Sequence, residues 1–152
     1  MLREICDAWA AEISSKVPAL SEAEVHLYAS WSPEDLYVPA QGRAFAVYPE
    51  GDPEVRVGFT TQPADLVTTS FLVEVWEDAT VESGRLQDDD ERNVAWLALF
   101  EAVKHRFYVG ENLQLGDAQV MDTHYLGASF GLAGGVRFFI LRFAIRRPES
   151  WT

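Results

Sequence analysis

Apolar side chains recur every three or four positions between residues 88 and 110, and this spacing predicts an amphipathic helix. The acidic run that begins at Asp88 places a capping side chain and negative charge at the electropositive helix start. Gly110 is a typical C-terminal stop. The apolar stripe comprises Trp96, Leu99, Phe100, Val103 and Phe107. We therefore expect a long helix over about 88–109, whose apolar face packs against a sheet.

A second helix is predicted over residues 2–16, where apolar side chains again follow helical spacing and Pro18 ends the pattern. Cys6 lies on the apolar face of this helix, and its expected role is that of a small buried side chain. Most of the remaining chain is alternating or continuously apolar, which is typical of strands. The expected strands cover residues 24–30, 43–48, 54–60, 68–77, 119–126 and 136–147.

Turn-forming residues separate these strands. Pro49 and Pro53 enclose Glu-Gly-Asp, which predicts a turn between two consecutive strands. Residues 127–135 are rich in glycine, and we expect them to form a flexible loop before the last strand. Residues 78–87 form a polar connection that we expect to be mobile, and residues 148–152 form a short tail.

The order of the elements predicts a single α+β domain over residues 1–152. Strands on either side of one long helix favour a mainly antiparallel β-sheet, covered on one face by the N-terminal helix and by the helix at 88–109. The strand over 68–77 is the most apolar of the first four, so we expect it near the centre of the sheet. A chain of 152 residues is long enough to bury one substantial core.

The last strand, residues 136–147, is apolar on both sides at its centre. Two layers alone would leave one of these sides in water, so we expect a partner chain to cover part of the second sheet face. Arg142 interrupts an apolar row and needs a carboxylate partner, from this chain or from a neighbour. The candidate interface residues are Trp76, Phe139, Leu141, Arg142, Phe143 and Trp151.

The charge of the chain narrows the possible partners. The formal net charge is −12, and the cations include only two lysines, Lys16 and Lys104. Tight binding to nucleic acid requires clustered Lys and Arg that neutralise phosphates, so this class of function is not expected. The single cysteine excludes an internal disulfide and suits a reducing compartment. No apolar run is long enough to cross a membrane, and the N-terminus does not have the pattern of a signal peptide.

Candidate chemistry is sparse. Asp122 and His124 would share one side of a strand and could begin an acid/base or metal site, but no third ligand follows at a recognised spacing. The glycine-rich residues 127–135 lack the Gly-Lys-Ser/Thr of a phosphate-binding loop. Helix capping accounts for the acidic run at 88–91 better than cation binding does. We therefore expect no catalytic, cofactor or metal residues, and a protein that is not an enzyme.

The order and spacing of eight segments provide a further clue. They are VPAL at 17–20, VHLY at 25–28, LYVP at 36–39, AFAVYP at 44–49, FLVEVW at 71–76, FYVG at 107–110, LQLG at 113–116 and GGVRF at 134–138. With an amphipathic helix before them and a long helix within them, these segments resemble the tail terminator proteins of long-tailed bacteriophages. The resemblance covers nearly the whole chain, although no single segment is diagnostic of that family.

The resemblance implies a structural virion protein that forms a homohexameric ring on the head-proximal end of the tail tube. Such a ring ends tube polymerisation and docks to the neck proteins. It implies no catalytic residues. The acidity of this chain fits that role, because a ring with a negatively charged lumen neutralises no phosphates and would let DNA pass without tight binding. The resemblance implies localisation in the virion after synthesis in the host cytoplasm.

Three alternatives remain open at the level of sequence. The chain could be another neck component, such as a head-closure or tail-completion protein. It could be an acidic inhibitor or immunity-type protein that masks a basic partner by charge complementarity. It could also be a small enzyme that uses Asp122 and His124. The first alternative assembles in the virion, the second predicts a monomer that captures a nuclease, and the third depends on those two side chains.

Overall fold

The computed structural model describes residues 2–28, 42–57, 66–78, 90–108, 114–115, 118–119, 122–133 and 135–148. Asp88, Trp151 and most of the 78–87 connection lie outside these residues, so the predictions made for them stay predictions. The elements are α1 Leu2–Lys16, the 3₁₀ helix η1 Pro18–Leu20, β1 Glu24–Leu27, β2 Arg43–Val57, β3 Leu66–Asp78, α2 Asp90–Tyr108, β4 Gln114–Leu115, β5 Ala118–Gln119, β6 Asp122–Ala133 and β7 Val136–Pro148.

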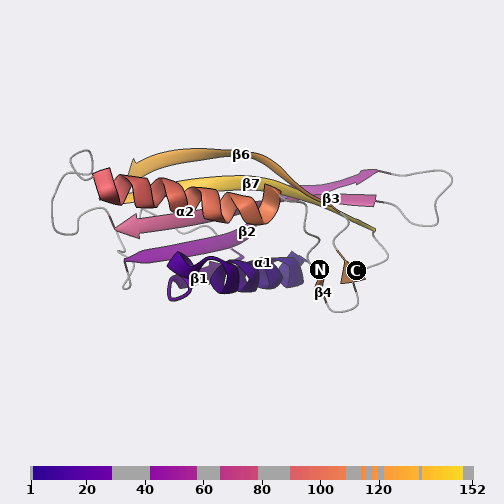
Figure 1. Ribbon diagram of the computed structural model, residues 1–152. Helices are drawn as coiled ribbons and strands as arrows, with labels where there is room; N and C mark the ends of the chain where they lie inside the picture. The colour runs from indigo at the N-terminus through magenta and orange to yellow at the C-terminus, as the bar shows by residue number, and fades with distance from the viewer. Residues whose placement is uncertain are drawn as a thin grey trace.

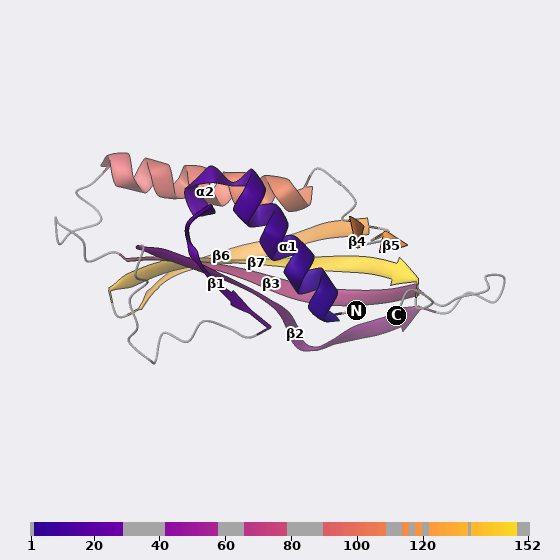
Figure 2. The same cartoon turned by 90° about the horizontal axis from the view of Figure 1, so that it is seen from below.

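The fold is α+β, as predicted. Five strands form one sheet in the order β1-β2-β3-β7-β6, while β4 and β5 form a separate pair. The sheet is mainly antiparallel, but β1 runs parallel to β2, with Glu24 beside Ala44 and Leu27 beside Val47. Helices α1 and α2 both lie against the same face of the sheet, which we call the helix face (Figures 1 and 2). The most apolar of the early strands, β3, occupies the central position, as expected.

The main core fills the space between the helices and the sheet. Fully buried side chains of α1, among them Trp9 and Ile13, meet odd-numbered residues of the strands, because alternate strand residues share a face. On β7 the buried residues are Phe139, Leu141, Phe143 and Ile145, and on β3 they are Phe71, Val73 and Val75. Rings pack closely here: Phe143 lies 5.5 Å from Trp9 and 5.7 Å from Phe71, measured between ring centroids.

The two predicted helices are confirmed, because the apolar stripe of each one meets this core. In α2, Trp96, Leu99 and Val103 are buried, and Phe100 packs partly against the same cluster. Helix α1 spans the predicted residues, and Cys6 is buried on its apolar face. Burial raises the pKa of the Cys6 thiol to about 12, because ionisation in an apolar environment is unfavourable. The thiol is therefore a packing group and not a reactive thiolate.

The predicted turn at residues 49–53 is wrong. Both flanking segments belong to the single strand β2 and pair with β3: Pro49 lies beside Phe71, and Glu54 lies beside Thr69. The register shift between Pro49 and Glu54 accommodates the turn-forming residues as an irregularity in a continuous strand. The thirteen residues of β3 provide enough length for both halves of β2 to pair with the same neighbour, so the chain does not reverse at this point.

The predicted loop at residues 127–135 is also wrong, since β6 continues through Gly127 and Gly131 to Ala133. The glycines serve close packing and backbone shape. A Cβ added at Gly131 would lie 2.3 Å from the Phe138 ring, its cross-strand neighbour. Gly127 has a φ of +136° at the point where the register between β6 and β7 shifts. The strand predicted over 119–126 begins only at Asp122, because Ala118–Gln119 forms β5.

Candidate interaction surfaces

Three of the four predicted interface residues on β7 lie in the chain's own core. Phe139, Leu141 and Phe143 have no exposed surface, because they point to the helix face and are covered by α1 and α2. The sequence showed that both sides of β7 are apolar, but it did not show which side the helices cover. Within the predicted set, Trp76 and Arg142 point to the opposite face. We call this the open face; it carries Leu72, Glu74, Trp76, Phe138, Ile140 and Arg142.

The centre of the open face is already buried within the chain. Trp76 is only 2% exposed and packs against Phe138 with a centroid distance of 4.7 Å. The Glu74 carboxylate, also buried, accepts a hydrogen bond of 2.6 Å from the Tyr48 hydroxyl and one of 3.2 Å from the Trp76 indole N–H. These two hydrogen bonds compensate for the removal of the carboxylate from water. A partner chain is therefore not needed to bury this cluster.

Arg142 has the carboxylate partner that the sequence predicted. Its Nη2 atom lies 2.7 Å from Oε1 of Glu50 on β2, and the Arg142 side chain is 54% exposed. Beside it a shallow hollow of about 260 Å³ follows the register shift of β6. Its lining residues are Leu72, Leu126, Gly127, Ala128, Ser129, Ile140 and Arg142. The open face thus carries a hollow with a mixed polar and apolar lining and a paired cation at its rim.

A buried ionic cluster lies on the helix face, and the spacing of the residues did not predict it. Arg137 of β7 forms an ion pair with Glu77 of β3, and both residues are buried. Arg43 of β2 reaches the same carboxylate at 3.0 Å. Arg137 also donates to the Asn93 side chain at 2.8 Å and lies over the Trp96 ring, 4.7 Å from its centroid. The cluster joins three strands to α2, so its role is to position α2 on the sheet.

One sequence signal could have revealed this cluster. Arg137 shares the parity of Phe139 and Leu141, so it had to lie on the same face as these core residues. Glu77 stands in the same relation to Val73 and Val75 on β3. Because β3 and β7 are adjacent and antiparallel, Glu77 and Arg137 are directly opposite in register. The missing information was the pairing of these two strands, which periodicity alone does not specify.

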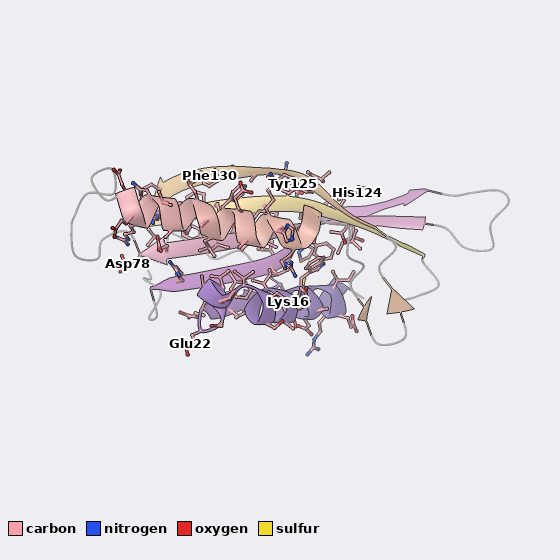
Figure 3. The ribbon with its side chains drawn as sticks, viewed as in Figure 1. Lys16, Glu22, Asp78, His124, Tyr125 and Phe130 are labelled. Carbon is pink, nitrogen blue, oxygen red and sulfur yellow. The ribbon has the colours of Figure 1, made fainter. Side chains whose placement is uncertain are left out.

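The exposed large apolar side chains of the described residues gather at the two edges of the sheet. One group, which we call the β6 edge, lies along β6 and the adjoining flank of α2 and comprises Val94, Leu97, Leu126, Phe130 and Leu132, each between 51% and 66% exposed. The other group, the β1 edge, comprises Val25 and Tyr28, which are 41% and 45% exposed. Figure 3 shows Phe130 on β6, on the opposite side of the molecule from Glu22 near β1.

The β6 edge is attached firmly to the core. Phe130 packs against Phe100 of α2 at a centroid distance of 4.8 Å, and Phe100 in turn lies 5.3 Å from Phe139. Lys104 of α2 lies 5.0 Å from the centroid of the Tyr125 ring on β6. These contacts hold α2 and β6 together as one surface. The half-exposed apolar residues along this surface therefore have a defined geometry before any partner binds.

The candidate chemical groups are not brought together. His26 lies on β1, His105 on α2 and His124 on β6, so the three histidines belong to three separate elements. His124 is exposed on β6, and the Asp122 side chain lies outside the described residues, so the predicted pair of Asp122 and His124 stays a prediction. Among the described residues, no three His, Cys, Asp or Glu side chains are placed to hold a metal ion. Neither described helix is sufficiently long and apolar to span a bilayer.

Comparisons with known proteins give a likeness of fold. No family model matches the chain, and no curated protein matches its sequence. Among solved structures, the chain is similar to a chain of the structure described as "Virion of native gene transfer agent (GTA) particle", with a TM-score of 0.59 and 18% sequence identity. The similarity covers 93% of this chain and 92% of that chain. The two chains therefore share a fold over nearly their whole lengths.

Proposed function

We propose that this chain is a structural virion protein of a phage-like particle. It forms a ring on the head-proximal end of the tail tube, ends tube polymerisation and docks to the neck. The observation that carries the proposal is the fold shared with a chain of a gene transfer agent virion, because it extends over 93% of this chain. The order of segments that resembles tail terminator proteins supports the specific position at the end of the tube.

The surface of the chain supports a role in assembly. A ring subunit needs apolar side chains that can be exposed to water in the free chain and whose burial against a neighbouring copy stabilises the ring. The exposed apolar residues of the β6 edge have this character, since Phe130 is half exposed and still packs on Phe100. A net charge of −12 per chain also supports a ring whose lumen lets DNA pass without binding it tightly.

Tube assembly in vitro tests the proposal. Tail tube protein from the same particle is polymerised with and without this chain, and tube lengths and tube ends are measured by negative-stain electron microscopy. We expect added chain to shorten the tubes and to place a ring on one end only. A chain that leaves the length distribution unchanged and is absent from tube ends would contradict the terminator role. Bovine serum albumin at the same concentration controls for crowding.

The same experiment separates the alternatives left open by the sequence. A head-closure or tail-completion protein would bind at the neck without changing the length of tubes that polymerise alone. In infected cells, loss of a terminator should give overlong tails, whereas loss of a neck component should give tails of normal length that lack heads. An acidic inhibitor would bind a basic nuclease as a monomer and would bind no tube.

A further inference from the structure

Among the described residues, seven exposed large apolar side chains lie on or beside two opposite edges of one sheet. Strand β6 ends the sheet on one side and β1 ends it on the other, among the residues that the structure describes. Within the described part of the chain neither strand pairs with another strand on its outer side, so both are candidate edges for pairing with a partner. The β6 edge and the β1 edge are therefore both sites at which an added chain could bury apolar surface.

The two edges differ, and this difference argues for head-to-tail contacts. Strand β6 has twelve residues and β1 has four. Contacts between unlike surfaces of identical chains repeat by rotation, and they close into a ring when the rotation is suitable. A two-fold contact of the β6 edge with itself would bury one patch but would leave Val25 and Tyr28 exposed. In a ring with a single rotation axis, such as the proposed one, a head-to-tail contact covers both edges with copies of the same chain.

Apart from the register shift at Gly127, β6 lacks the features that protect edge strands from pairing. Monomeric proteins protect their edges with charges, prolines or short strands. From Tyr125 to Ala133, β6 has neither a charged residue nor a proline. Strand β1 is short and includes Glu24 and His26, whose side chains lie 3.3 Å apart. The long edge is thus open to pairing, and the short edge has a polar pair that restricts the register of a partner.

We infer that neighbouring copies of this chain join head to tail, with the β6 edge of one copy against the β1 edge of the next. This inference rests on the proposed ring and assigns its subunit contact to the edges of the sheet, whereas the sequence had suggested the second sheet face. The open face does not need that role, since Glu74 and Trp76 at its centre are already buried. Burial of Phe130 and Leu132 against Val25 would remove apolar surface from water on both sides.

Two edge variants and one control test the inference. Leu132→Glu places a charge on the β6 edge, and Val25→Glu places one on the β1 edge. Ala102→Glu is the matched control, because Ala102 is exposed on a different flank of α2. Native mass spectrometry and light scattering give the oligomeric state of the full chain over a range of concentrations. Far-UV circular dichroism and thermal unfolding verify that each variant folds.

The wild-type chain and the Ala102→Glu variant are expected to form the same closed oligomer. Each edge variant should assemble more than about tenfold less readily, because a buried unpaired carboxylate is strongly unfavourable. A mixture of the two edge variants should form a one-to-one dimer and no ring, since each copy retains one intact edge. This mixing result is specific to head-to-tail contacts and does not arise from a general loss of solubility.

Three outcomes would overturn the inference. The wild-type chain could remain monomeric at high micromolar concentration; both edge variants could assemble like the wild type; or Val25→Glu could assemble normally while Leu132→Glu does not, which would indicate a two-fold β6 contact. None of these outcomes depends on tail tubes. The tube-length experiment can therefore succeed when the edge contact fails, and the edge contact can be found when the chain does not shorten tubes.

Discussion

Arg137 and Arg142 lie five residues apart on β7, and they point to opposite faces of the sheet. Arg137 lies beneath α2, where it pairs with the buried Glu77 and donates to the side chain of Asn93. Arg142 is on the open face, half in water, and pairs with Glu50. The two ion pairs therefore differ in the free energy that the loss of one partner costs, because burial determines that cost.

The physical reason is desolvation. A buried guanidinium has lost its hydration and depends on every donor–acceptor contact around it, so removal of one charge leaves the other uncompensated. The Glu77 carboxylate forms ion pairs with both Arg137 and Arg43, so two cations offset the cost of removing its charge from water. When the exposed ion pair between Arg142 and Glu50 is broken, water takes the place of the lost contact, so the free energy of unfolding changes little. The ionic cluster of Arg137 is therefore sensitive to the loss of one charge, and the pair of Arg142 and Glu50 tolerates it.

The strongest test of this contrast is Arg137→Ala. This substitution leaves the buried Glu77 with the ion pair to Arg43 and removes the hydrogen bond that Arg137 donates to Asn93. We expect the free energy of unfolding to fall by about 3–5 kcal/mol, the usual cost of breaking a buried pair from one side. Urea denaturation followed by circular dichroism measures this change. A loss below about 1 kcal/mol would show that the cluster is solvated like a surface pair.

Tyr48→Phe tests whether buried polar groups on the open face contribute as much to the free energy of unfolding as those on the helix face. The variant keeps the ring but removes the hydroxyl that donates to Glu74 at 2.6 Å. Trp76 remains as a donor to the other carboxylate oxygen, at 3.2 Å. We expect a loss of about 1–3 kcal/mol, since a buried acceptor loses its shorter hydrogen bond. An unchanged midpoint of urea unfolding would mean that water replaces the hydroxyl without cost.

Gly131→Val tests the close packing between β6 and β7. A Cβ at this position would lie 2.3 Å from the Phe138 ring, so the ring must shift, which changes its contact with Trp76. Because the contact involves the far end of a side chain, we expect a loss of only about 1 kcal/mol. Thermal unfolding measures the loss, and near-UV circular dichroism should report the altered tryptophan environment. Ser129→Ala, an exposed position on the same strand, is the control and should change neither signal.

Arg142→Ala is the smallest expected effect and completes the comparison with Arg137→Ala. Its ion pair with Glu50 is exposed to water, so we expect a loss of at most about 1 kcal/mol in low salt and less in high salt. Urea denaturation at two ionic strengths gives both values. A destabilisation as large as that of Arg137→Ala, insensitive to salt, would show that the two faces do not differ in the way described above.

Several parts of the fold could be predicted because they depend on local physical chemistry. Helical spacing of Trp96, Leu99 and Val103 identified the buried side of α2, and the apolar run around Val73 identified the central strand. The need of Arg142 for a carboxylate followed from its position in an apolar row, and Glu50 supplies it. In each case the evidence lies within a few residues of sequence, where side-chain direction follows from the period of the element.

The predictions were wrong where the structure of a segment depends on the strand with which it pairs. The residues between Pro49 and Pro53 have turn chemistry, but the length of β3 keeps both halves of β2 in one strand. The glycines at 127 and 131 suggested flexibility, whereas they accommodate a register shift and the ring of Phe138. Local composition limits the conformations that a segment can adopt, and pairing with the neighbouring strand determines which of these conformations has the lowest free energy.

The sequence by itself determined which residues of each helix and strand share a face, because period 3.6 and period 2 are properties of the backbone. It could not determine which of the two apolar sides of β7 lies under the helices. That choice was made by long-range pairing and packing, which placed Phe139, Leu141 and Phe143 in the core and left Phe130 and Leu132 exposed at a sheet edge. A sheet acquires an inside, an outside and free edges only when all its strands are assembled, since each of these is defined by neighbours distant in sequence.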